Sequence, residues 1–195
     1  MKLRSVIFSC LLCLPLSAVA DNDNSQSDSG FFDNWGSGIS VGVPNYFFDK
    51  QDNEVGAGAY FDFYPCDKEY LNFRIGVEGS HIGVDEPGSE QYAEFPGKST
   101  RLTFIRIPIS AEYVVPFSDN GRVYLGVGPD LVRTANDLSD FTVGLHLSGR
   151  AEYSISSHWR LAVEGGYMWS EVSDDNGPDI NLDGAYVIPT VGYQF

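Results

Sequence analysis

Residues 141–153 read FTVGLHLSGRAEY, and this stretch decides the fold class. Its odd-numbered positions are mostly apolar, whereas its even-numbered positions include His146, Arg150 and Glu152. Side chains alternate between the two faces of a β-strand, while helical spacing would mix the two sets. The stretch therefore predicts a long strand with one apolar face and one polar face.

The same alternation recurs along the chain, for example in LNFRIGVEG from Leu71 and in RLAVEGGYMWS from Arg160. Each segment is about as long as the ~9–11 residues that a tilted strand needs to cross a bilayer, or longer. The fold class expected is all-β, an eight-stranded antiparallel up-and-down transmembrane β-barrel. Its strands are expected near residues 36–48, 54–64, 69–81, 100–115, 121–133, 140–154, 158–171 and 184–195.

The connections between these segments alternate in length. Short ones such as PFSDNG and SISSH are interleaved with mostly longer, acidic ones such as EVSDDNGPDINLD. Outer-membrane barrels have short periplasmic turns, long outer loops and aromatic girdles at both interfaces. Aromatic residues of the apolar face fall near the two expected rims: Phe63, Tyr113, Tyr153, Trp159, Tyr193 and Phe195 near the short turns, and Phe47, Phe141, Tyr167 and Trp169 near the long loops.

A soluble β-sandwich or a lipocalin-like barrel would also alternate, but it would bury its apolar face. Glycines occur on the polar face of the alternating segments, where small residues would make room for other side chains in a narrow lumen. Their position favours a barrel whose polar face points inward, as in a membrane barrel. These glycines are Gly56, Gly58, Gly76, Gly126, Gly128 and Gly192.

The first residues, MKLRSVIFSCLLCLPLSAVA, combine Lys2 and Arg4 with an apolar run that ends in Ala-Val-Ala. This pattern is typical of a secretory signal peptide. We expect residues 1–20 to be cleaved, residues 21–35 to form a short acidic disordered segment, and residues 36–195 to form the barrel. The expected location is the outer membrane of a Gram-negative bacterium, with both termini in the periplasm.

Several quoted stretches are similar to known small barrels. The terminal VGYQF, with Tyr193 and Phe195, resembles the signature by which the β-barrel assembly machinery recognises its substrates. The pairs IPISAEYVVPFSDNGRVYLGVGPDLV and GLHLSGRAEYSISSHWRLAVEGGYMW resemble strand–turn–strand units of barrels of the OmpA transmembrane-domain and OmpX type. The resemblance implies the fold and no particular activity.

The charge is distributed unevenly. The four long connections, taken as 49–54, 81–100, 133–140 and 171–183, carry a net charge of −11, and the barrel with its short turns carries −2. Charges in a narrow lumen are costly unless they are paired. We therefore predict an ion-pair network in a closed lumen, with a charge-lined pore as the alternative. The network is expected to contain Asp62, Arg74, Glu78, Arg106, Glu112, Arg122, Asp130, Arg150, Glu152, Arg160 and Glu164.

His146 and Ser148 share one face of a strand, with Glu152 in reach, which are the residue types needed for acyl transfer. Outer-membrane lipid A deacylases are eight-stranded barrels with a His-x-Ser pair, but their pair faces the lipid and an Asn follows it. Here the pair belongs to the lumen-facing set and Gly149 follows. We therefore interpret His146, Ser148 and Glu152 as polar lumen groups, and the chain as non-enzymatic.

The stretch DINLDG from Asp179 matches the start of an EF-hand loop, but Thr190 stands where the bidentate Glu is required. No cofactor is expected beyond a loosely bound divalent cation, for which the weak candidates are Asp174, Asp175, Asp179 and Asp183. The acidic exterior argues against a nucleic-acid partner.

Three hypotheses for function follow. The leading one is a scaffold that displays acidic loops for adhesion, for ligand or ion binding, or for envelope integrity. Its expected partners are outer-membrane lipid, lipopolysaccharide, the assembly machinery and an extracellular ligand. The second is a narrow porin-like channel for small polar solutes, and the third is an enzyme similar to lipid A deacylases.

Overall fold

The computed structural model describes residues 35–51, 53–65, 69–84, 100–135, 142–172 and 180–195. Every regular element in these ranges is a β-strand. The strands are β1 (Trp35–Gly42), β2 (Asn45–Phe48), β3 (Glu54–Val55), β4 (Ala57–Pro65), β5 (Leu71–Val84), β6 (Thr100–Pro116), β7 (Gly121–Ala135), β8 (Thr142–Ser154), β9 (Trp159–Trp169), β10 (Glu171–Val172), β11 (Ile180–Asn181) and β12 (Gly184–Gln194). No helix in these ranges is long and apolar enough to cross a membrane.

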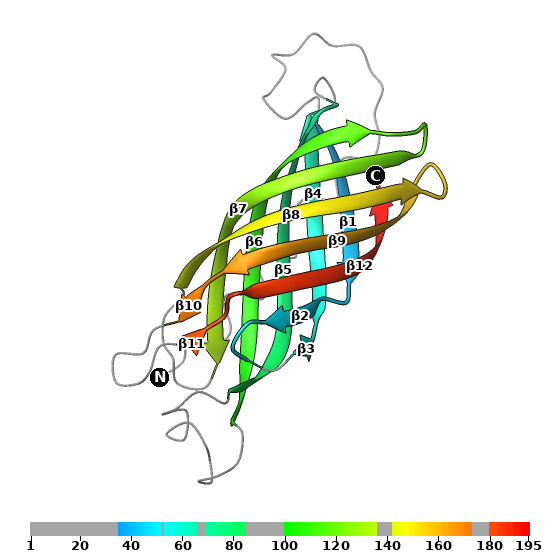
Figure 1. Ribbon diagram of the computed structural model, residues 1–195. Helices are drawn as coiled ribbons and strands as arrows, with labels where there is room; N and C mark the ends of the chain where they lie inside the picture. Colours follow the sequence, from blue (N-terminus) through cyan, green and yellow to red (C-terminus); the bar gives the residue numbers. More distant parts are fainter. Residues whose placement is uncertain (1–34, 52, 66–68, 85–99, 136–141, 173–179) are drawn as a thin grey trace, which may run out of the picture. The chain divides into compact units, whose positions relative to one another are not determined.

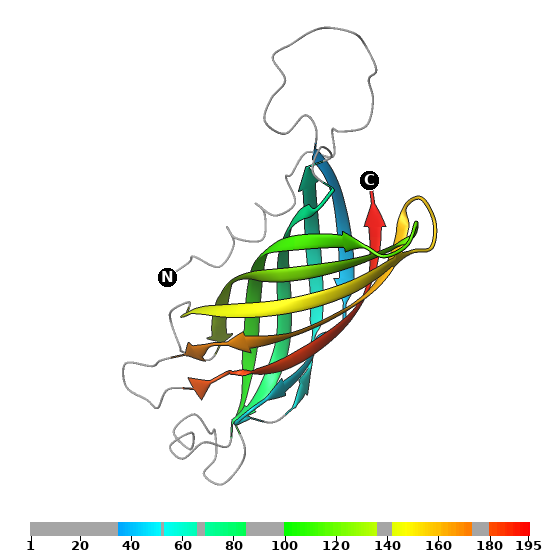
Figure 2. The same cartoon turned by 45° about the horizontal axis from the view of Figure 1, so that its top comes forward.

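The strands close into a barrel. Each long strand from β4 to β9 pairs antiparallel with the next, and β9 pairs with β12 (Figure 1). The barrel closes where β1 lies between its two partners, with Gly38 opposite Gln194 of β12 and Gly42 opposite Gly58 of β4. Figure 2 shows the same closure from a second direction.

Two of the expected strands are interrupted. The first breaks between β1 and β2 at Val43 and Pro44, and the second breaks between β3 and β4 at Gly56. Proline has no backbone N–H to donate, which interrupts the ladder. Hydrogen bonding continues around the break, because the Gly56 N–H donates to the Pro44 carbonyl (2.8 Å) and the Val43 N–H to the Pro189 carbonyl (3.1 Å). β1 with β2 and β3 with β4 each make up one interrupted barrel strand, so the ten strands of the sheet correspond to eight barrel strands. The predicted eight-stranded antiparallel barrel is confirmed.

The stretch 171–183, expected to be a loop, contains a short ladder. Glu171 and Val172 of β10 pair with Asn181 and Ile180 of β11, which extends the β9–β12 hairpin beyond the main sheet. Strand alternation does not predict this ladder, because the segment 171–183 contains seven charged or amide side chains together with a proline and a glycine.

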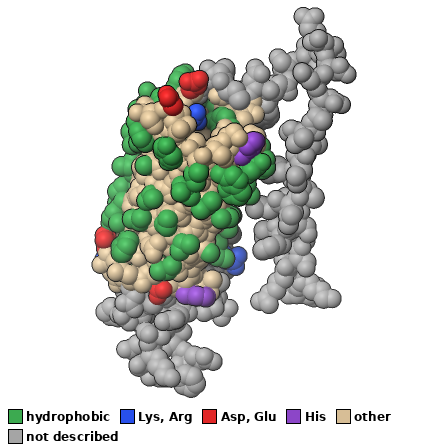
Figure 3. All heavy atoms as spheres, turned by 90° about the vertical axis from the view of Figure 1, so that its right-hand side faces the viewer, with side chains coloured by type: hydrophobic (Ala, Val, Ile, Leu, Met, Phe, Trp, Pro, Cys, Tyr) green, Lys and Arg blue, Asp and Glu red, His purple; other side chains and the backbone are tan. Residues whose placement is uncertain are grey.

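The outer wall is apolar. Val143, Leu145 and Leu147 of β8 are each more than half exposed, and Figure 3 shows hydrophobic side chains over the middle of one face. The expected girdles are also outward-facing, as shown by Tyr113, Trp159 and Phe195 at the turn end. Phe141 lies outside the described residues. The exposed apolar wall is what a lipid-facing barrel requires and what a soluble barrel avoids.

Close strand contacts depend on glycine at Gly128. A Cβ there would lie 1.8 Å from the backbone carbonyl oxygen of Ile109, a group that cannot rotate away. At Gly149, on the lipid-facing set of β8, an added Cβ would meet only Leu125 Cδ2 at 4.0 Å.

We therefore expect Gly128→Ala to lower the free energy of unfolding by about 3 kcal/mol, because the β6–β7 ladder must shift. Gly149→Ala should leave it within about 0.5 kcal/mol. Urea unfolding in lipid vesicles, followed by tryptophan fluorescence, measures both. Equal stability of the two variants would contradict the packing described here.

Candidate functional site in the barrel lumen

The lumen-facing side chains come from alternate positions of neighbouring strands. On β8, for example, His146, Ser148, Arg150 and Glu152 are buried while the residues between them point outward or are only partly covered. The structure places ten of the eleven residues of the expected network inside the barrel, none more than 6% exposed.

Arg122 is the exception, and the expectation is wrong for this residue. It lies at the start of β7, opposite Pro116, and its side chain is exposed. Its cross-strand neighbour Glu152 interacts with Arg150 and Arg160 instead. The alternation gives the correct face of the strand for Arg122, but it cannot show that the strand has already reached the rim.

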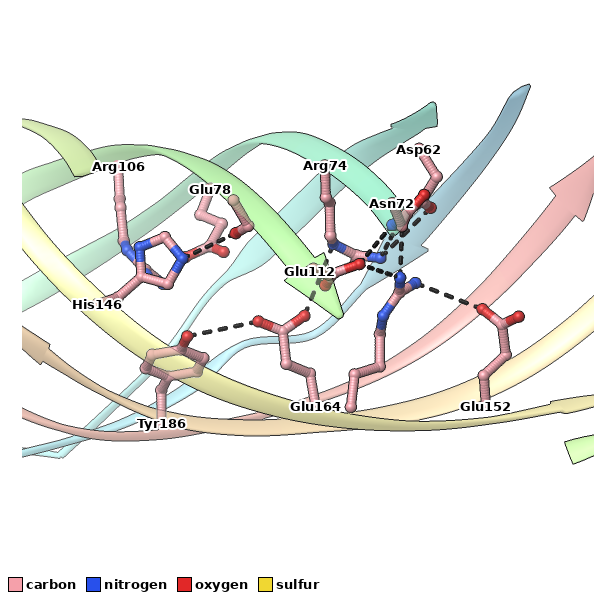
Figure 4. Close-up of polar contacts among 12 residues, drawn as sticks. Asp62, Asn72, Arg74, Glu78, Arg106, Glu112, His146, Glu152, Glu164 and Tyr186 are labelled. Carbon is pink, nitrogen blue, oxygen red and sulfur yellow. Dashed lines mark hydrogen bonds and ion pairs between the residues drawn. The ribbon is translucent and has the colours of Figure 1, made fainter. Parts of the chain in front are cut away.

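Seven of the charged side chains form one group toward the short turns, here called the turn-side cluster: Asp62, Arg74, Glu112, Arg150, Glu152, Arg160 and Glu164. Arg150 is its centre. Its Nη2 lies 2.6 Å from Glu112 Oε2 and 3.1 Å from Asp62 Oδ1, and its Nη1 lies 3.4 Å from Glu152 Oε2. Figure 4 shows other members of the cluster, including Asp62, Arg74 and Glu112.

The other members of the turn-side cluster are linked through the same carboxylates. Arg74 contacts Asp62 at 3.3 Å and Glu164 at 3.6 Å, and Arg160 contacts Glu152 at 3.1 Å. Asn72 donates its side-chain amide to Asp62 Oδ1 (3.1 Å) and to Glu112 Oε2. Asn72 is not part of the predicted network, although it belongs to the same alternating set.

A second group, the loop-side cluster, consists of Glu78, Arg106, Asp130 and His146. Arg106 bridges two strands, with Nη1 3.1 Å from Glu78 Oε2 and Nη2 3.0 Å from Asp130 Oδ1. His146 Nδ1 lies 2.8 Å from the same Asp130 oxygen. Tyr46 donates its hydroxyl hydrogen bond to Glu78 Oε2, so an aromatic side chain completes this cluster.

Aromatic rings also cover the guanidinium groups. The Cζ atoms lie 3.9 Å from the Tyr124 ring centroid for Arg150 and 4.1 Å from the Tyr60 centroid for Arg74. Arg106 lies 4.5 Å from the centroid of Tyr186. A desolvated cation–π contact contributes about 2 kcal/mol. The tyrosines therefore compensate part of the lost hydration of the guanidinium groups.

The two clusters do not balance in formal charge. Together they contain four arginines against six carboxylates, with His146 as a further titratable group. The turn-side cluster alone has three arginines and four carboxylates. Every carboxylate contacts a guanidinium group, but some guanidinium groups are shared, so each cluster has one formal negative charge in excess when His146 is neutral.

The candidate acyl-transfer residues do not come together. The structure pairs His146 with Ser110, whose Oγ lies 2.8 Å from Nε2, and not with Ser148. Glu152 lies in the turn-side cluster, where it accepts hydrogen bonds from Tyr124, Arg150 and Arg160. Ser110, His146 and Asp130 contact one another in the order serine, histidine, carboxylate, as in a catalytic triad. All three residues are at most 4% exposed, however, which leaves no path for an acyl substrate.

An apolar cluster fills the lumen toward the long loops. This apolar cap consists of Tyr46, Phe48, Tyr60, Phe104, Val132, Met168, Val172, Ile180, Leu182, Tyr186 and Ile188. Phe104 packs edge-on against Tyr46 and Phe48, with centroids 5.3 and 6.0 Å apart. The alternation predicts a polar lumen throughout and does not reveal this cap. Its members Val172, Ile180 and Leu182 lie in the stretch 171–183, which is expected to be a loop.

The lumen is more open toward the short turns. A cavity of about 240 Å³, here called the vestibule, opens there between the buried Asn72 and Tyr124 and the rim residues Glu69 and Arg122. Deeper inside, beside Asp62 and Arg150, a cavity of about 10 Å³ has room for about one water molecule.

The candidate ion ligands are largely untested. Asp174, Asp175 and Asp179 lie outside the described residues. Asp183 accepts hydrogen bonds from the Ser170 N–H (2.8 Å) and the Asn181 side-chain amide (3.1 Å), which is a structural role in the β10–β11 hairpin.

Tyr193 and Phe195, the expected assembly signal, lie side by side at the end of β12. Their ring centroids are 5.6 Å apart, and Tyr193 also contacts the Trp159 ring at 5.4 Å. Recognition by the assembly machinery remains a prediction. The expected signal peptide and acidic segment lie outside the described residues, apart from Trp35, which begins β1.

Comparison with known families agrees with this architecture. Residues 6–195 match the family model described as outer membrane protein beta-barrel domain. The chain belongs to this family. It is therefore a protein of the bacterial outer membrane, and its environment includes membrane lipid. No curated protein matches the sequence.

Solved structures show the same fold for this outer-membrane barrel at low sequence identity. Pseudomonas aeruginosa OprG is similar at 12% identity and a TM-score of 0.61, covering 82% of this chain and 96% of OprG. Neisserial surface protein A is similar at 15% identity and a TM-score of 0.52, covering 83% of this chain and 97% of that protein. The outer membrane protein AlkL is similar at 10% identity and a TM-score of 0.54, covering 90% of this chain and 97% of AlkL.

Removing the central guanidinium tests the network. We expect Arg150→Met to lower the free energy of unfolding by roughly 3–5 kcal/mol, because it leaves buried carboxylates without their partner. Arg122→Met, on the neighbouring strand but exposed, should change it by less than about 1 kcal/mol. Urea titration in vesicles measures both, and a mild effect of Arg150→Met would indicate that water solvates the cluster.

Proposed function

We propose that this outer-membrane barrel is a closed, non-enzymatic scaffold that acts through its acidic surface loops. The observation that carries the proposal is the filling of the lumen, by ion pairs in its middle and by the apolar cap toward the long loops. Eight strands enclose an interior just wide enough for side chains. With the lumen occupied in this way, the surface is left to make contact with partners.

The loops are suited to a basic partner or to divalent cations. The four long connections carry a net charge of −11, against −2 for the barrel and its short turns. Exposed charges of one sign attract oppositely charged partners over about 10 Å at 0.1 M salt. For this function the long-loop end faces the outside of the cell and both termini face the periplasm, the usual orientation of this class of barrel.

A narrow channel is the second candidate. The vestibule favours it, because this cavity enters the lumen from one end of the barrel as far as Asn72 and Tyr124, which hydrogen-bond to the turn-side cluster. The apolar cap opposes it, because a pathway would have to cross residues such as Phe104 and Met168 that are fully buried. We therefore favour the closed scaffold over the channel as the function of this barrel.

The loop hypothesis is tested by neutralising Asp174, Asp175 and Asp179 together as asparagine, which leaves the structural Asp183 in place. Binding of an oligolysine peptide to proteoliposomes at low salt should weaken about tenfold, because three charge pairs of several tenths of a kcal/mol each would be lost.

The matched control is Glu69→Gln with Asp119→Asn on the short-turn side, in barrels whose orientation is established by protease protection. This variant should bind the peptide like the native chain from the long-loop side. Equal loss in both variants, or loss in neither, would refute a specific role for the acidic loops.

A further inference from the structure

The vestibule has the features of a small-molecule site. It is a concave space of about 240 Å³, smaller than most drug-sized pockets, so its ligand would have only a few heavy atoms. Its walls include Pro65, Leu71, Val114 and Pro116, which offer an apolar surface. A ligand for this space therefore has an apolar part.

The floor of the vestibule presents hydrogen-bond acceptors. Asn72 is 2% exposed, and its Nδ2 donates to both Asp62 and Glu112 of the turn-side cluster (Figure 4). Asn72 lines the vestibule, and because its amide nitrogen is engaged in that cluster, its carbonyl oxygen is the side-chain atom that can accept a hydrogen bond from a ligand. Tyr124 likewise gives its hydroxyl hydrogen to Glu152 at 2.9 Å, so its oxygen can only accept. A ligand that binds at this floor must therefore supply a hydrogen-bond donor.

The charge behind the floor favours a cationic donor. The turn-side cluster has one carboxylate more than it has guanidinium groups, and Asn72 and Tyr124 lie between this cluster and the vestibule. A net negative charge on a buried cluster is costly in a low-dielectric interior, even where each carboxylate contacts a guanidinium group. A cation at the floor would offset it, whereas an anion would add to it. At the mouth, Glu69 and Arg122 carry opposite charges and leave no net preference.

We propose that the vestibule binds a small amphipathic ammonium ion. The ammonium group donates to the Asn72 carbonyl oxygen and to the Tyr124 hydroxyl oxygen, and its short alkyl part lies against Leu71 and Val114. This site is separate from the acidic loops and from the loop-side cluster, and it does not require the lumen to conduct.

The probe for this site is n-butylammonium, with butyrate and n-butanol as ligands of similar size that lack the cationic donor. The protein is the native chain refolded into lipid nanodiscs and labelled with ¹⁵N. The side-chain amide signal of Asn72 reports binding at the floor. We expect a saturable shift of this signal with n-butylammonium and no saturable shift with the other two.

Two variants separate charge from space. Glu112→Gln keeps an oxygen for the Asn72 amide but removes the excess charge, and it should weaken n-butylammonium binding about tenfold. Val114→Trp fills the vestibule without touching the ion pairs, and it should abolish binding. Val115→Trp, on the outward face of the same strand, should bind like the native chain.

The absence of a saturable shift in the native chain would overturn the proposal, as would an equal response to butyrate or butanol. Binding that survives Val114→Trp would place the ammonium ion elsewhere and would also overturn it. Because Val114→Trp leaves the turn-side cluster intact, the test stands even where Glu112→Gln does not fold.

Discussion

The contact between Arg150 and its three carboxylates is the interaction on which this barrel depends. A guanidinium group buried between strands is costly by itself, and it becomes tolerable because Asp62, Glu112 and Glu152 all lie within 3.4 Å. These carboxylates come from β4, β6 and β8, so the ion pairs connect strands that are not neighbours in the sheet. The outward face supplies no comparable constraint, because lipid is as apolar as the side chains that it meets.

The lumen changes character along its length. It runs from the vestibule at the short turns through two charged clusters to the apolar cap. The tyrosines connect these layers, since Tyr46 donates to Glu78 and Tyr186 covers Arg106 while both belong to the cap. In our account the cap and the charged clusters close the barrel together, so that the molecule acts at its two ends.

The alternation of residues 141–153, repeated along the chain between connections of alternating length, was sufficient to predict the fold, because the long strands of this chain keep their periodicity nearly uninterrupted. The same rule gave the lumen-facing side chains, including Arg106 and Glu164. It could not give their partners, which depend on the register between strands: His146 contacts Ser110 of β6 and not Ser148 of its own strand. It also could not give the depth of each residue, so Arg122 was expected inside, and it did not reveal the cap, where apolar residues occupy lumen-facing positions.

The closed lumen is tested most directly by single-channel recording of the refolded native chain in a planar bilayer. Our account predicts a silent trace, because the ion pairs of Arg106 and Arg150 and the apolar cap leave no continuous path for ions. Steady, discrete openings of the native chain would contradict it. If Arg106→Ala then enlarged those openings, the loop-side cluster would be a gate and the protein a channel.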